Sequence, residues 1–295
     1  MKFTVSILTY TALDHTKRCV ESVLANSDHA QTRLLLTANG SVEAYEYFST
    51  IEDAYENVAV IYNENNHGFI EPNKSALKSA NSEFFVMLND DAIVSGGWLE
   101  KLEAPFLYDP LCALSGPTGG KFRHGPAMPE TQWLEGSCIM GRTAILKSVG
   151  LFSDYLKFAT WEEIDLGFRL IEKGYTLHLT PFDFGHAGKA TRRKIVGMDS
   201  IEKANLNEVR KRFPQYFSNA SRHSERIGRG VTNRPNGLHE RPGPRGRSIA
   251  TVARWPGSLQ RMVIRQFYEP SSHSSKMVLA RMDRGRRCSR RAGEW

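Results

Sequence analysis

The residues best suited to chemistry follow a short apolar run, in the segment EFFVMLNDD that ends at Asp91. Five consecutive apolar residues are typical of a strand that is buried on both faces. The run stops at Asn89, Asp90 and Asp91, which we call the acidic turn. Two carboxylates thus stand at the carboxyl end of a predicted strand, where open α/β sheets bind ligands, and such oxygen ligands suit Mg²⁺ or Mn²⁺. A solvated turn is the alternative, because Asn and Asp are ordinary turn residues.

The elements that must position these residues alternate between strands and helices. Short β-type runs predict four strands, at Phe3 to Tyr10, Arg33 to Thr37, Val58 to Tyr62 and Glu83 to Leu88. Helical segments lie between them; Asp14 is expected to cap the first, and the third is expected to open near Pro72. Strands joined by helical crossovers predict an α/β fold with a mostly parallel, open sheet flanked by helices.

After the acidic turn the alternation is less regular. We expect, in order, a helix, a short strand, a Gly/Pro/His-rich loop, a strand and a short helix, at Trp98 to Tyr108, Cys112 to Ser115, Gly116 to Pro129, Trp133 to Met140 and Thr143 to Val149. A clear amphipathic helix starts at Thr160 and ends at Gly174, and a strand from Thr176 to Pro181 follows it. His186 is expected just beyond a strand end.

Charge divides the chain into two parts. Residues 221–295 carry 16 Arg and 1 Lys against 5 acidic residues, a net charge of +12, whereas residues 1–220 have a net charge of −5. The basic part is also rich in Gly, Pro and Ser, a composition that buries too little apolar surface to order itself. We therefore expect a folded domain over 1–218 and a basic, Arg-rich, largely disordered tail over 219–295, with a short amphipathic helix at 249–268.

Length and cysteine usage indicate the class of protein and its compartment. With 295 residues, 40% of them hydrophobic, the chain can bury a full α/β core. The start MKFTVSILTY is expected to be a strand and not a signal peptide, and the sequence holds no apolar run long enough for a membrane span. The four cysteines lack disulfide or metal-site spacing, which predicts reduced thiols and a cytoplasmic protein, with peripheral membrane attachment as an option.

Seven short motifs in order resemble those of the family 2 glycosyltransferases. They are VSILTY, NGS, NxGF followed by Asn73, LNDD, WLxGS, EEIDLGFRL and a late FGH. The resemblance covers roughly residues 3–190, and its nearest subgroup is the rhamnosyltransferase-like enzymes. It implies the GT-A fold, which binds nucleotide sugars, and an inverting, metal-dependent enzyme that moves a sugar from a nucleotide-diphosphate donor to an acceptor hydroxyl.

The resemblance also implies roles for individual residues. Asp91 and His186 would hold Mn²⁺ or Mg²⁺, and Asn89 and Asp90 would lie near the ribose and diphosphate of the donor. Further residues at family positions are expected to bind the donor: Thr9, Tyr10, Asn39, Asn66, Gly68, Asn73 and Gly136. The place of His186 after a predicted strand and near a basic cluster favours a site role over a structural one.

Glu162 and Glu163 stand where the family has a Glu-Asp pair whose second acid is the catalytic base. The resemblance therefore implies Glu163 as the base, with Glu162 as the alternative. A structural interpretation is also open, because Thr160 and Glu163 have the spacing of a capping box. Asp165 and Arg169, four residues apart on the same helix, are expected to form a surface ion pair.

Three positions depart from the family pattern. Ala38 stands where a base-binding Asp usually precedes Asn-Gly-Ser, Thr11 replaces a frequent Asn, and Pro72 replaces the usual Arg. The phosphate and metal positions are kept better than those that read the base. The nucleotide is therefore left open, and a degenerate nucleotide-sugar-binding protein is an alternative.

Other functions and partners follow from the remaining residues. A nucleotidyltransferase would share the strand-end carboxylates, although TYTALDHT is not the Gly-rich, basic loop that it would favour. Only the tail suggests nucleic-acid binding, and nucleic acid is not the partner we expect. We expect a nucleotide-sugar donor over which Lys189, Arg192 and Arg193 would close, and an acceptor that is a glycan, a lipid or a protein. An anionic membrane surface is the expected partner of the tail.

Overall fold

A computed structural model of the chain describes residues 1–122, 131–187 and 197–217. The chain divides into two units, Met1–Thr232 and Asn233–Trp295, and all of the described residues belong to the first. In this described part, no helix combines the length and the apolar character that crossing a bilayer requires.

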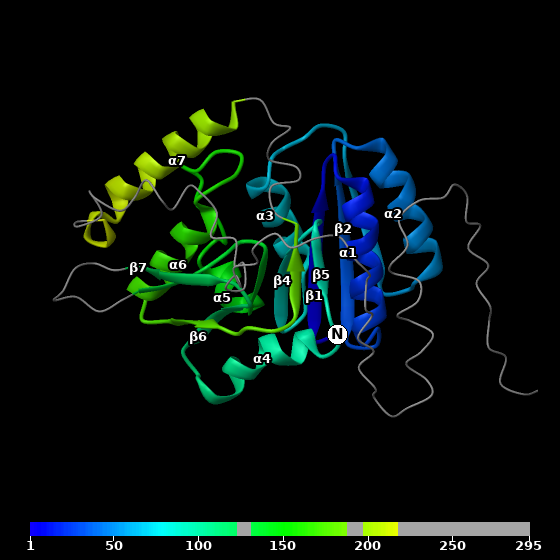
Figure 1. Ribbon diagram of the computed structural model, residues 1–295, viewed down its shortest axis with the longest axis horizontal. Helices are drawn as coiled ribbons and strands as arrows, with labels where there is room; N and C mark the ends of the chain where they lie inside the picture. Colours follow the sequence, from blue (N-terminus) through cyan, green and yellow to red (C-terminus); the bar gives the residue numbers. More distant parts are fainter. Residues whose placement is uncertain (123–130, 188–196, 218–295) are drawn as a thin grey trace, which may run out of the picture. The chain divides into compact units, whose positions relative to one another are not determined.

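Seven strands form one sheet (Figure 1). In the order in which they hydrogen-bond, they are β10 (Thr176–Leu179), β6 (Cys112–Gly116), β9 (Cys138–Arg142), β4 (Phe84–Asn89), β1 (Phe3–Thr9), β2 (Thr32–Asn39) and β3 (Val58–Asn63). Among these strands β9 alone runs antiparallel to its neighbours. The expected mostly parallel α/β sheet is confirmed, with the strand before the acidic turn in its middle.

Strand β4 is buried on both faces, as its apolar run predicts. Phe84, Val86 and Leu88 pack into the core on one face, together with α1, α2 and α4. Phe85 and Met87 pack into the core on the other face, with α3, α5, α6 and α7. The helices in these two layers (Figure 1) are α1 (Leu13–Asn26), α2 (Val42–Ala54), α3 (Ile70–Ser79), α4 (Trp98–Tyr108), α5 (Thr143–Ser148), α6 (Glu162–Glu172) and α7 (Met198–Arg212).

Two antiparallel pairs of short strands accompany the main sheet. Strand β5 (Ala92–Val94) starts directly after the acidic turn and pairs with β11 (Phe184–His186). Strand β7 (Gly119–Phe122) pairs with β8 (Thr131–Leu134), and a 3-10 helix (Pro214–Tyr216) follows α7. The β5–β11 pair brings a segment that is distant in sequence to the end of β4.

Three expectations about these elements are wrong in detail. The segment from Gly116 to Pro129 is not all loop, because it contains β7, which bonds to β8. The single strand expected from Trp133 to Met140 is two strands, since residues 135–137 turn between β8 and β9. Ala12, not Asp14, is the N-cap of α1, and Asp14 lies in its first turn, where its charge suits the helix dipole.

Some predictions fall on residues that the structure does not describe. Lys189, Arg192 and Arg193 lie outside the described residues. The same holds for the tail over 219–295 and the helix expected at 249–268. The domain boundary and the roles expected of these segments stay predictions.

Candidate active site

The acidic turn lies at the carboxyl end of the middle strand of the sheet, where β5 and β11 bring a histidine to it. Asp90 and Asp91 follow β4 directly, and β5 starts at Ala92. His186 stands opposite Ala92 in the β5–β11 ladder, and the backbone N–H of Ala187 donates to the carbonyl of Asp91. This register puts Nε2 of His186 3.0 Å from Oδ1 of Asp91. The two residues predicted to hold a metal are thus adjacent in the fold.

Asp91 and His186 stabilise each other's charged form. Burial acts to raise the pKa of Asp91, but the hydrogen bond and charge of His186 outweigh it and hold that pKa below its usual value. Burial likewise acts to lower the pKa of His186, but the bond to Asp91 outweighs it and raises that pKa. His186 is expected just beyond the end of the strand at Thr176 to Pro181, but it is the last residue of a separate short strand, β11, so that expectation is wrong.

Asp90 has a different environment from its neighbour Asp91. Its side chain is buried, and Oδ2 accepts a hydrogen bond from the hydroxyl of Thr16 at 3.4 Å. The hydroxyl of Thr16 also lies 3.2 Å from that of Thr9. Burial, and then the charge of Asp91, raises the pKa of Asp90 to about 7. A divalent cation at the turn would favour the ionised form of both carboxylates.

The donor atoms at the turn fit a hard divalent cation. Asp91 offers a carboxylate oxygen and His186 an imidazole nitrogen, and the side-chain amide of Asn89 lies 3.4 Å from that nitrogen. Among the described residues, no group of three His, Cys, Asp or Glu side chains could hold a metal ion by itself. Two protein ligands leave positions for phosphate oxygens and water, which is how Mg²⁺ is usually bound in proteins.

Several predicted donor residues form one hydrogen-bonded loop. Asn39, the last residue of β2, is buried, and its Nδ2 donates to Oδ1 of Asn66 and to the carbonyl of Gly68, each at 2.9 Å. Its Oδ1 accepts from Nδ2 of Asn63 at 3.1 Å and from the backbone N–H of His67 at 3.2 Å. These four bonds use the hydrogen-bonding capacity of the amide. Asn39 therefore shapes the loop that carries Asn66 and Gly68.

The remaining predicted donor residues lie on β1 and α3. Strands β1 and β4 are parallel neighbours, so Thr9 and Tyr10 come at the same edge of the sheet as Asn89. Thr9 is buried and Tyr10 is half-buried. Asn73 is buried in α3, where its Nδ2 donates to the carbonyl of Phe69 at 2.8 Å, one turn earlier in the chain.

The two acids at the start of α6 are positioned by an irregular backbone. Glu162 is the first residue of α6 and is only 6% exposed, whereas Glu163 is half-buried. The N-cap is Trp161, with a φ of 68°, and it makes no side-chain cap hydrogen bond. Thr160 precedes it with a φ of 80° and not in the extended conformation of an N-cap. The alternative interpretation of Thr160 and Glu163 as a capping box is therefore wrong.

The turn at residues 135–137 connects this helix start to the acidic turn. A Cβ atom added at Gly136 would lie 3.7 Å from Cδ of Glu163, which is van der Waals contact. The preceding residue, Glu135, has its carboxylate 3.8 Å from Nδ1 of His186. One short turn thus touches both the predicted base and the predicted metal ligand.

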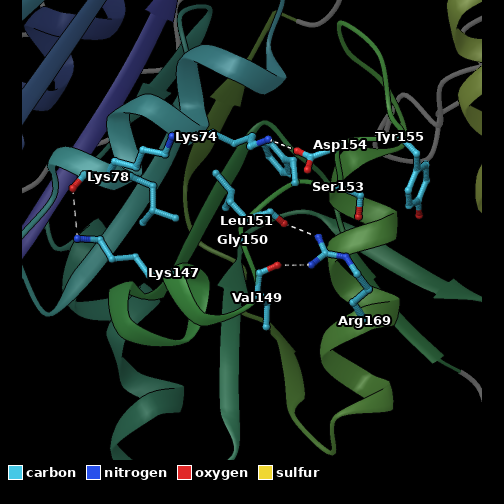
Figure 2. Close-up of a pocket in the computed structure, with 12 residues that line it drawn as sticks. Lys74, Lys78, Lys147, Val149, Gly150, Leu151, Ser153, Asp154, Tyr155 and Arg169 are labelled. Atoms are coloured by element: carbon cyan, nitrogen blue, oxygen red, sulfur yellow. Dashed lines mark hydrogen bonds and ion pairs between the residues drawn. The ribbon is translucent and has the colours of Figure 1, made fainter.

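Asp165 and Arg169 of α6 anchor the loop that precedes the helix. Asp165 is fully buried and accepts hydrogen bonds from the hydroxyls of Ser153 and Tyr155 and, at 2.8 Å, from Nε of Arg169. Arg169 also donates to two backbone carbonyls of that loop (Figure 2). The expected ion pair of Asp165 and Arg169 exists, but it is not a surface pair, because residues 149–155 fold over it.

A groove of about 800 Å³ lies beside this anchor. Figure 2 shows Lys74 and Lys78 of α3, Lys147 and Arg169 around it. Three of these cations are engaged by the protein: Lys74 with Asp154, Lys147 with the carbonyl of Lys78, and Arg169 with the loop backbone. The residues that line it in the described part include none of those predicted to bind donor or metal. The groove is therefore separate from the acidic turn.

Two residues that support these sites were missed from the sequence. Thr16 holds Asp90, and its spacing with Val20 and Val23 could have placed it on the buried face of α1. Asn205 of α7 bonds to the backbone of residues 157–160. No motif marks Asn205, because a single Asn in a polar helix usually faces solvent.

Comparison with solved structures finds glycosyltransferases. PcManGT, a mannosyltransferase from Pyrobaculum calidifontis in complex with GDP-Man and Mn²⁺, has 13% identity and a TM-score of 0.50 over 61% of this chain and 55% of that chain. S. aureus TarS 1-349 in complex with UDP-GlcNAc has 16% identity and a TM-score of 0.53 over 78% and 77%. GalNAc-T7 with UDP, GalNAc and Mn²⁺ has 14% identity and a TM-score of 0.51 over 60% and 42%.

At these identities the likeness shows the fold, which is of the GT-A type. The chain spans about half of the length of the mannosyltransferase and less than half of GalNAc-T7. The search of curated proteins gives no match. The rhamnosyltransferase-like subgroup stays a prediction. Residues 4–152, half of the chain and including the acidic turn, match the model described as glycosyl transferase family 2, so the chain belongs to that family.

Proposed function

We propose that this glycosyltransferase moves a sugar from a nucleotide-diphosphate sugar to an acceptor hydroxyl, with inversion and with Mn²⁺ or Mg²⁺ held by Asp91 and His186. The observation that carries the proposal is the 3.0 Å approach of these two side chains at the carboxyl end of β4. Open α/β sheets bind their ligands at that edge. Membership of the family favours sugar transfer over the nucleotidyl transfer that strand-end carboxylates would also suit.

The acidic turn would act on the leaving group. Departure of a nucleoside diphosphate puts negative charge on its oxygens, and the cation would neutralise that charge. Thr16 donates a hydrogen bond to the Asp90 carboxyl beside Asp91, and a bound cation would favour the ionised form of both carboxyls. His186 must give up its proton before Nε2 can bind a cation, so cation binding would replace the ion pair with Asp91.

Glu163 would act on the acceptor. It is half-buried and lies against Gly136, whereas Glu162 is almost fully buried, so a substrate hydroxyl reaches Glu163 more easily. A carboxylate that takes the hydroxyl proton contributes typically about 10²–10⁴-fold to the rate. A single displacement with one such base inverts the anomeric carbon.

The proposal covers a class of donors and a class of acceptors. Solved neighbours were complexed with GDP-Man, UDP-GlcNAc or UDP, which supports a nucleotide-sugar donor without selecting the base. Ala38 is fully buried and offers no side-chain group to read the base. We propose a glycan, a lipid or a protein as acceptor.

The test is a screen of nucleotide sugars with uridine, guanosine or thymidine diphosphate leaving groups, with Mn²⁺, with Mg²⁺ and with a chelator. We expect metal-dependent release of nucleoside diphosphate from one donor, by slow hydrolysis without acceptor and faster when the acceptor is supplied. The same screen is run on Asp91→Asn, which should lose the metal-dependent release. Its matched control is Asp53→Asn, at an exposed position near the end of α2, which should retain activity.

Two results would contradict the proposal. Turnover that the chelator does not affect would remove the metal from the mechanism. No turnover of any donor, together with stabilisation by oligonucleotides instead of nucleoside diphosphates, would favour a nucleic-acid-binding protein.

A further inference from the structure

The segment just before α6 has an unusual backbone. Phe158, Thr160 and Trp161 have φ values of 62°, 80° and 68°, and none of them is glycine. The left-handed region is unfavourable for residues with a Cβ atom, and most of all for a β-branched residue such as Thr160. Such conformations persist only where surrounding groups hold them. The start of α6 therefore depends on what binds this segment.

Asn205 of α7 holds one side of the segment. Its side chain is 1% exposed, and its Nδ2 lies 2.9 Å from the carbonyls of Lys157 and Ala159 and 3.1 Å from that of Thr160. Its Oδ1 accepts from the backbone N–H of Lys157 at 3.0 Å. A single amide thus bonds to three residues of the segment from a helix more than 40 positions later in the chain.

The N-terminus of α3 holds the other side. The carbonyl of Phe158 accepts from the backbone N–H groups of Phe69, at 2.6 Å, and Ile70, at 3.2 Å. Gly68 makes this approach possible, because a Cβ atom there would lie 2.5 Å from the Phe158 carbonyl oxygen. The segment is therefore fixed between the loop that carries Gly68 and helix α7. It continues directly through Trp161 into Glu162, the first residue of α6.

We propose that Asn205 is a positioning residue for the acids at the start of α6. Removing its amide releases the carbonyls of Lys157 and Thr160, and the left-handed residues can then relax toward ordinary conformations. That relaxation moves Glu163 relative to Gly136 and the acidic turn, which lie on other elements. The inference rests on the proposed function, because it concerns the base of that reaction.

The test compares three single variants on α7 with the wild-type protein. Asn205→Ala removes the amide, Asn207→Ala is the exposed control two residues away, and Val209→Ala loosens the same helix at a fully buried position without touching these bonds. For each we measure kcat and KM for metal-dependent turnover of the nucleotide sugar found in the screen, and the affinity for nucleoside diphosphate with Mn²⁺. Hydrogen exchange of residues 158–165 provides a readout independent of activity.

We expect Asn205→Ala to lower kcat about 10–100-fold, as a small misplacement of a reacting group does, with KM and nucleotide affinity changed less than about twofold. Exchange of 158–165 should be faster in this variant than in the wild-type protein, in Asn207→Ala and in Val209→Ala. Asn205→Gln, which keeps the amide but displaces it by one methylene, should show the same separation of kcat from KM to a smaller degree. This milder variant keeps the test decisive if Asn205→Ala does not fold.

Two results would overturn the inference. One is wild-type kcat in Asn205→Ala, or in Asn205→Gln if only that variant folds. The other is an equal loss of kcat in Val209→Ala at a temperature where both proteins are folded, since Asn205 would then only support the core. Failure of the proposed function would appear differently, as absence of turnover in the wild-type protein itself.

Discussion

The acidic turn and the start of α6 both present carboxylates next to residues 135–137, but they are held in different ways. The β5–β11 ladder fixes His186 beside Asp91 through backbone hydrogen bonds. The start of α6 follows left-handed residues that are held by the side chain of Asn205 and by the backbone N–H groups of Phe69 and Ile70. A backbone ladder is formed by any sequence that adopts the strands, whereas a side-chain clamp depends on single residues. The start of α6 is therefore the part that point changes disturb most easily.

The largest effect is expected at the predicted base. Glu163→Gln keeps the shape of the side chain but cannot accept a proton, so turnover should fall about 10²–10⁴-fold while melting temperature and nucleotide affinity stay the same. Steady-state kinetics with the donor from the screen measures this. Glu162→Gln is the paired variant: if it abolishes turnover while Glu163→Gln retains it, the base is Glu162.

The second-largest effect is expected on stability, at the buried ion pair of Asp165 and Arg169 in α6. Asp165→Ala leaves Arg169 without its buried partner, and breaking such a pair typically costs about 3–5 kcal/mol. Asp154→Ala removes one acidic partner of Lys74, but its carboxylate is 91% exposed, so the loss of stability should be much smaller than for Asp165→Ala. Urea unfolding of both variants tests the contrast. Equal losses would mean that Asp165 does not anchor the loop.

A smaller effect concerns Asp90 and pH. Its pKa is about 7 in the folded protein against a usual 3.8, so the folded state binds more protons between these values, and metal-free stability falls as pH rises through that window. Asp90→Asn should therefore be more stable than wild type at pH 8, by roughly 1–4 kcal/mol, and similar to it below pH 4. Unfolding curves in chelator at both pH values measure this. A variant less stable than wild type at pH 8 would contradict the burial of an unfavourable charge there.

The smallest effect is expected on stability when Thr is replaced by Gly at each of two positions, Thr160 and Thr143. The hydroxyls of Thr160 and Thr143 are both buried without a hydrogen-bond partner among the described residues. Thr160 is left-handed, so Thr160→Gly should stabilise the protein by up to about 1 kcal/mol. Thr143 is helical, so Thr143→Gly should destabilise it by a similar amount. Changes of the same sign would mean that the backbone before α6 is not strained.

The sequence predicted the position of the acidic turn well, for a physical reason. Apolar runs such as Phe84 to Leu88 determine buried strands, and the end of the middle strand then determines where the acidic turn lies. The ladder that brings His186 to Asp91 has strands of three residues, which are too short to leave a periodic signal. Only the resemblance to a family linked these two residues in advance.

The backbone that precedes α6 could not be predicted from local sequence patterns. Residues such as Phe158, Thr160 and Trp161 disfavour positive φ, so residue propensities do not predict a left-handed backbone at these positions. The spacing of Thr160 and Glu163 indicated a capping box instead. Asp165 and Arg169 have the spacing of a surface pair, and their burial depends on how residues 149–155 fold over them. These features depend on tertiary contacts.

The most direct test of the central claim is calorimetric binding of nucleoside diphosphates with and without Mn²⁺, in wild type, Asp91→Asn and Asp53→Asn. We predict that wild type and Asp53→Asn bind a nucleoside diphosphate in a Mn²⁺-dependent way, and that Asp91→Asn, folded by circular dichroism, loses that dependence. Unchanged Mn²⁺-dependent affinity in Asp91→Asn would contradict the assignment of the metal to the acidic turn.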